Sequence, residues 1–151
     1  MAVYAAYGKA MIAAHSLERR MAALLLVRRA EKIESKIAVE VTDIDRLTLG
    51  QLIGHFAHEF SPPAALTTEL GNMLYFRNLL AHRISHKILS AAQKDGWEEN
   101  LVIELYEISG HFKETSEALQ PYIDSCLSSF SLAYNSLMEK LLPRYTARTE
   151  G

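Results

Sequence analysis

One segment of the chain combines residue types that could cleave a phosphodiester bond. It runs from Arg77 to Lys87 as RNLLAHRISHK, and it contains no acidic residue. Guanidinium groups offer planar forks of donors to phosphate oxygens, and histidine side chains accept or donate protons near neutral pH. We therefore expect metal-free cleavage of RNA, in which the 2′-hydroxyl attacks its own phosphate. His82 moves a proton, Arg77 offsets the developing charge, and Asn78 holds the substrate or orients the histidine. The alternative is an ordinary surface histidine with arginine neighbours.

The spacing of these residues on a helix separates the candidate catalytic groups. Asn78 and His82 are four positions apart, so they share one face of an α-helix. Arg77 precedes His82 by five positions and points about 140° away from it. A long arginine side chain can reach round the helix, and a second copy of the helix could bring the groups together. Either arrangement would let the three groups act on one substrate.

Other chemistries find little support in the sequence. His82 and His86 have the H-x-x-x-H spacing of metal ligands, but Arg83 stands where a zinc protease has its glutamate, and no third ligand is obvious. A second small cluster, His55 and His58 with a following glutamate, is predicted to have a surface or helix-end role. The sequence has no glycine-rich phosphate loop, nucleophile elbow or C-x-x-C pair. We predict neither a metal site nor a cofactor.

Apolar residues at steps of three and four predict long amphipathic helices around this segment. The first helix is predicted over residues 3–36, with a basic second half that we interpret as a solvated face. A connector over 37–46 leads to a capping box formed by Thr48 and Gln51, which begins a short helix that ends near residue 60.

Prolines and a glycine divide the rest of the chain. Residues 61–63, Ser-Pro-Pro, separate the short helix from the next one, which is predicted over 64–93 and carries the cationic segment. A stop signal at Gly96 follows. The last apolar pattern covers 98–142 and contains Pro121, which either splits it into two helices or kinks one.

These patterns predict an all-α fold, a bundle of four to five helices. Residues 1–142 form one domain, and 143–151 form a polar tail. The chain has 151 residues, 49% of them hydrophobic, and a net charge of −2, which excludes a generic basic nucleic-acid coat but not a local basic site. Its one cysteine, Cys126, is predicted to be a buried small hydrophobe. No apolar stretch is long enough to span a membrane, so we expect a cytoplasmic protein.

The motif Arg-Asn-x-x-x-His within a helical bundle resembles the HEPN superfamily (higher eukaryotes and prokaryotes nucleotide-binding). Over roughly residues 4–120 the chain is similar to small stand-alone HEPN-like proteins of bacteria and plasmids. The segments that carry this similarity are Tyr7-Gly8-Lys9, Ser16-Leu17-Glu18, Leu49-Gly50-Gln51-Leu52-Ile53 and Arg77-Asn78-Leu79-Leu80-Ala81-His82-Arg83.

This resemblance implies a HEPN-like fold and a metal-independent endoribonuclease that acts as a homodimer, with two motifs facing each other in one composite cleft. Arg77 and His82 would be catalytic and Asn78 would support them. The RNA-binding residues implied around them are Arg83, His86 and Lys87. Many such proteins are toxins or act in phage defence, so RNA and an antitoxin protein are the expected partners, and DNA is not.

Two further points follow from the resemblance. Several toxin-type members have a tyrosine two residues after the histidine, where this chain has Ile84. That difference argues against the branch whose tyrosine is modified by a nucleotidyltransferase antitoxin. Many members are also non-catalytic, so the alternative function is a binding or dimerisation module.

Overall fold

The computed structural model describes residues 2–32, 44, 46–132 and 135, and its elements are all helical. They are α1 (Ala2–Lys32), α3 (Leu49–Phe60), α4 (Ala64–Asn78), the π-helical segment η1 (Leu79–Arg83), α5 (Ile84–Ala91) and α6 (Trp97–Ala118). The predicted all-α helical bundle is confirmed. Within the described part of the chain, no helix is both long and apolar enough to cross a membrane.

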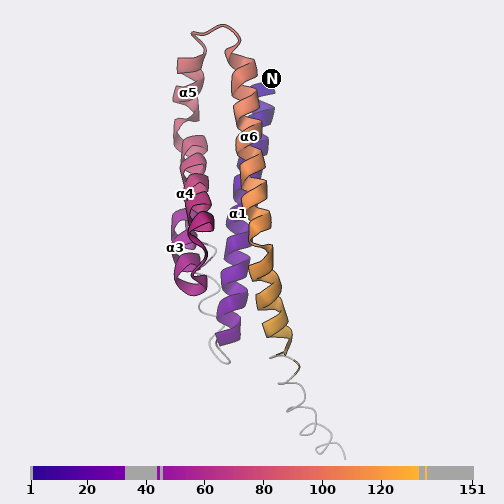
Figure 1. Ribbon diagram of the computed structural model, residues 1–151. Coiled ribbons are helices and arrows are strands. Elements are labelled where there is room, and N and C mark those ends of the chain that lie inside the picture. Colours follow the sequence, from indigo (N-terminus) through magenta and orange to yellow (C-terminus); the bar gives the residue numbers. More distant parts are fainter. Residues whose placement is uncertain (1, 33–43, 45, 133–134, 136–151) are drawn as a thin grey trace, which may run out of the picture.

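The pairing of α1 with α6 forms the centre of the bundle (Figure 1). Along α1, Ala6, Ala10 and Ala14 lie at steps of four residues and are almost fully buried. Larger core side chains follow toward its C-terminal end, and α6 contributes its own stripe of Leu101, Leu105, Ile108 and Phe112. Lys9 lies over the ring of Tyr106, and Arg20 donates to Ser116 Oγ, so the two helices run in the same direction.

The helices α4 and α5 form successive parts of one rod beside this pair (Figure 1). The rod runs opposite to α6, because Phe76 lies against His111 while Lys87, further along, pairs with Glu104. The short helix α3 contacts both α1 and α4. Its buried residues Leu49, Leu52 and Phe56 complete the core where α3 packs against these two helices.

Local signals in the sequence place the helix ends correctly. Thr48 caps α3, and its side chain and that of Gln51 satisfy each other's backbone amides as a capping box. Ser61 ends the helix in the left-handed conformation, with φ of 44°. Pro63 then caps α4, and Gly96, with φ of 69°, precedes α6. The boundaries predicted for α3 and for the start of α4 are confirmed.

The sequence left open whether Pro121 splits the last predicted helix or kinks it, and the structure shows two helices. The helix α6 ends at Ala118, Leu119 is a turn residue, and a further helical stretch covers 120–132. Pro121 therefore lies in the first turn of a new helix, where its missing N–H costs nothing. The predicted segments 33–43 and 136–142 and the tail 143–151 lie outside the described residues.

The basic half of α1 is not simply a solvated face. Arg19 is exposed, as predicted, but Arg20 hydrogen-bonds to Gln120 beyond α6. Arg29 pairs with Glu59 of α3 at 3.3 Å from Nε to Oε1. The prediction is wrong for Arg20 and Arg29 because their long side chains reach acceptors on neighbouring helices. Tyr4, near the start of α1, is exposed and does not lie on the core face.

Candidate active site

The predicted regular helix over 64–93 is interrupted at the motif. Arg77 and Asn78 end α4, and the next five residues form the π-helical segment η1. In a π-turn the backbone hydrogen bond spans five residues instead of four, and single π-turns inside α-helices are frequent at functional sites. The hydroxyl of Tyr7 on α1 donates to the carbonyl of Leu80 at 3.3 Å. A side chain that enters the hydrogen-bond ladder is a known cause of such irregular turns.

Asn78, His82 and Arg83 line one cavity beside η1, of about 460 Å³, together with Tyr75 and Leu79. We call it the motif cavity. Asn78, His82 and Arg83 are exposed, so the cavity opens to solvent. Among the residues that the structure describes, no carboxylate lines it. The prediction that Asn78 and His82 share a face is confirmed. The guanidinium of Arg83 and the imidazole of His82 therefore line the same cavity as the Asn78 amide, which can hold a ligand.

Arg77 points to a different place. Its Nε donates to Glu18 Oε1 on α1 at 3.0 Å, and both side chains are mostly buried, 26% and 19% exposed. The other carboxylate oxygen of Glu18 pairs with His15 Nδ1 at 3.1 Å. Arg77 is not among the residues of the motif cavity. Within one chain the structure therefore separates Arg77 from the motif cavity that His82 lines, as the spacing predicted.

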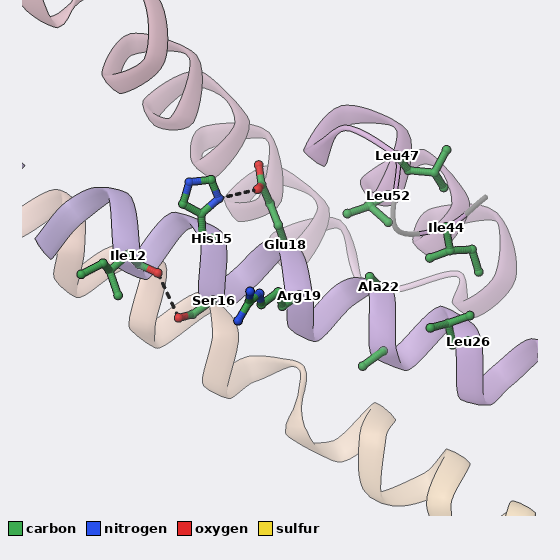
Figure 2. Close-up of a pocket in the computed structure, with 11 residues that line it drawn as sticks. Ile12, His15, Ser16, Glu18, Arg19, Ala22, Leu26, Ile44, Leu47 and Leu52 are labelled. Carbon is green, nitrogen blue, oxygen red and sulfur yellow. Dashed lines mark hydrogen bonds and ion pairs between the residues drawn. The ribbon is translucent and has the colours of Figure 1, made fainter. Parts of the chain in front are cut away.

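A larger cavity, of about 870 Å³, lies along α1 (Figure 2). Its polar end holds His15 and Glu18, joined by their hydrogen bond, and its opposite end is apolar, with Ile44, Leu47 and Leu52. Glu18 thus lines this cavity and anchors Arg77 at once. The cavity holds no residue of the motif itself, and its carboxylate is already paired twice, so it offers less free chemistry than the motif cavity.

The remaining predicted RNA-binding residues lie beyond η1. His86 is exposed on α5, one turn past the motif cavity. Lys87 is paired with Glu104 of α6, which fixes its ammonium group against the bundle. Of the three residues predicted to bind RNA, Arg83 alone lines the motif cavity.

Histidine clusters in the described part of the chain do not assemble into a metal centre. No three His, Cys, Asp or Glu side chains there are placed to hold one ion. In the second histidine cluster, His55 Nδ1 lies 3.4 Å from a terminal nitrogen of Arg29, which also pairs with Glu59. His58 is exposed. This cluster is part of the contact between α1 and α3.

Two residues of the site were not predicted from the sequence. Tyr75 lies seven positions before His82, a multiple of the helical turn, so its place on the same face could have been inferred. Glu18 is 59 positions from Arg77. The available signal was weak: Glu18 is the first acidic residue of the chain, and it precedes a basic run.

Comparisons with models of protein families, with curated proteins and with solved structures find no match for this chain.

Proposed function

We propose that the protein is a metal-independent endoribonuclease of the HEPN type, which acts as a homodimer with a composite active site. The observation that carries this proposal is the motif cavity, where Asn78, His82 and Arg83 lie together and no carboxylate of the described part of the chain joins them. A phosphodiester carries negative charge, so a cavity with donors and no acid suits it. The π-turn beneath the cavity adds support, because such turns are frequent at functional sites.

The proposed reaction is an intramolecular transesterification. The 2′-oxygen of one nucleotide bonds to the adjacent phosphorus, and the bond from phosphorus to the 5′-oxygen of the next nucleotide breaks. His82 accepts the proton of the 2′-hydroxyl, and His82 of the partner subunit gives a proton to the departing 5′-oxygen. The products are a 2′,3′-cyclic phosphate and a 5′-hydroxyl. Asn78 and Arg83 hold the non-bridging phosphate oxygens or orient the imidazole.

A second copy of the chain gives Arg77 its proposed part in this reaction. The bond of Arg77 to Glu18 uses Nε, and no partner of its two terminal nitrogens is found among the described residues. Those nitrogens can donate to a phosphate that the partner subunit brings near. Glu18 then orients the guanidinium, and its negative charge is already shared with His15.

Cleavage of RNA by purified protein in the presence of a chelator tests the proposal. We expect His82→Ala to lower the cleavage rate by about 10²–10⁴-fold, the usual contribution of a proton-transfer group. His58→Ala is the matched control, because His58 is an exposed histidine on α3, outside the motif cavity, and this variant should cleave like wild type. Mass spectrometry should find 2′,3′-cyclic phosphate ends. Equal rates for wild type and His82→Ala would refute the proposal.

One observation favours a second candidate, a non-catalytic HEPN-like binding or dimerisation module. Arg77 is engaged with Glu18 inside its own subunit, as a purely structural arginine would be. Under this function, neither wild type nor His82→Ala cleaves RNA, while both remain folded and dimeric by sedimentation. The same set of samples therefore separates the two candidates.

The cellular setting follows from the HEPN resemblance. We propose a cytoplasmic enzyme with a toxin or phage-defence role, restrained by an antitoxin protein, with RNA as its nucleic-acid partner. Growth arrest on expression of wild type, and its absence with His82→Ala at equal protein level, would support this role.

A further inference from the structure

We propose that Tyr75 is the residue that positions single-stranded RNA at the motif cavity, by stacking its ring on a base. This inference rests on the proposed function, because it takes RNA to be the ligand. Tyr75 has one of the larger hydrophobic side chains of α4, and yet it is 61% exposed. It lines the same cavity as Asn78, His82 and Arg83. An exposed aromatic ring beside a cation and an amide is a combination that suits single-stranded nucleic acids, whose bases stack on aromatic rings and whose phosphates pair with cations.

The ring of Tyr75 is supported by neighbouring aromatic rings. It meets the ring of Phe76 edge to face, with 5.7 Å between centroids. Phe76 in turn stacks on His111 of α6 at 6.2 Å, with 14° between the ring planes. This chain of rings connects Tyr75 to α6, where His111 is itself exposed. A supported ring loses less conformational freedom when a base stacks on it.

The other well-exposed tyrosines among the described residues lack this setting. The ring of Tyr106 is covered by the ammonium group of Lys9, 4.8 Å from its centroid. Tyr4 is 74% exposed but lies on α1 and lines neither the motif cavity nor the cavity along α1. Tyr75 therefore presents an exposed ring in the same cavity as a cation, Arg83, and the candidate proton-transfer group, His82.

The position of Tyr75 also predicts which nucleotide it reads. It precedes His82 by seven residues, about 10 Å along a helix axis. At roughly 3.4 Å for each stacked nucleotide, that distance corresponds to about three nucleotides. The stacked base therefore lies about three nucleotides away from the cleaved bond. Tyr75 would fix the register of the strand, so that one phosphate reaches His82.

Binding of a short single-stranded oligonucleotide with 2′-O-methyl groups tests the proposal, since this probe lacks the attacking hydroxyl and stays intact. We expect Tyr75→Ala to raise Kd by about 5- to 150-fold, the usual effect of losing one stacked base. Tyr75→Phe keeps the ring and should bind like wild type. Tyr4→Ala is the matched control and should also bind like wild type. With an abasic strand of equal length, Tyr75→Ala should no longer differ from wild type.

Several results would overturn the inference. They are no binding of the probe by wild type, equal Kd values for wild type and Tyr75→Ala, equal losses in Tyr75→Ala and Tyr75→Phe, or an equal effect on the abasic strand. A change in dimerisation in place of RNA binding would assign Tyr75 to a protein interface. Failure of the proposed function looks different: wild type would bind the probe through Tyr75 and yet leave unmodified RNA uncut.

Discussion

The two halves of the helical rod that carries the motif are held in different ways. Before η1, α4 buries Leu70 and Met73, and Leu80 within η1 is also fully buried. After η1, α5 buries no residue at all, and its contacts with the bundle are half-buried side chains and the ion pair of Lys87 with Glu104. The motif lies where the packed half meets the exposed half.

This difference shows how the fold combines a fixed backbone with accessible side chains. Leu80 points into the core, and its carbonyl is held by Tyr7. His82, only two residues later, lies at the surface in the motif cavity. A site that must hold a flexible strand of RNA benefits from such an anchor, because the reacting groups keep their places while remaining open to substrate.

The largest expected effect comes from breaking the packed half. Leu80→Ala removes a fully buried side chain and leaves a cavity in the core, so it should lower the free energy of unfolding by about 2–5 kcal/mol. Leu89→Ala, on α5, is the matched control. Leu89 is 68% exposed, and its replacement should change stability by less than about 0.5 kcal/mol. Urea unfolding followed by circular dichroism measures both, and similar losses would contradict the comparison.

A smaller effect is expected from the hydroxyl that holds the π-turn. Tyr7→Phe keeps the ring and removes the donor to the Leu80 carbonyl, which should cost about 0.5–1.5 kcal/mol. Hydrogen exchange should rise first at backbone amides of η1 and α5. Tyr4→Phe, which alters an exposed tyrosine three residues earlier, should leave both measurements unchanged. Unaltered exchange in Tyr7→Phe would show that the turn does not depend on this contact.

The features predicted from the sequence are those that neighbouring residues determine. The capping box at Thr48 and the stop at Gly96 depend on residues within a few positions, and the steps of the core follow from the helical period. The face shared by Asn78 and His82 is local in the same sense. These features could be predicted because the physical cause lies within the segment that shows the effect.

The features that were missed depend on residues far apart in the chain. The contact of Tyr7 with Leu80 spans 73 positions, that of Glu18 with Arg77 spans 59, and that of Arg20 with Gln120 spans 100. Nothing within residues 77–83 distinguishes a π-turn from an α-turn, since the donor that bonds to its carbonyl lies on α1. Arg20 and Arg29 were predicted to belong to a solvated face, but they too bond to residues far away in the sequence.

The smallest effects should separate the two ion pairs on either side of η1. Arg77 and Glu18 are 26% and 19% exposed, whereas Lys87 and Glu104 are 33% and 40% exposed. Water and salt screen the second pair more, so its coupling should be about 0.2–0.5 kcal/mol, against about 1 kcal/mol for the first. Double-mutant cycles with Gln at each position measure both couplings. Raising the salt concentration should reduce the coupling of Lys87 with Glu104 by the larger fraction. If the two couplings were equal, the packed half of the rod would hold Arg77 no more firmly than the exposed half holds Lys87.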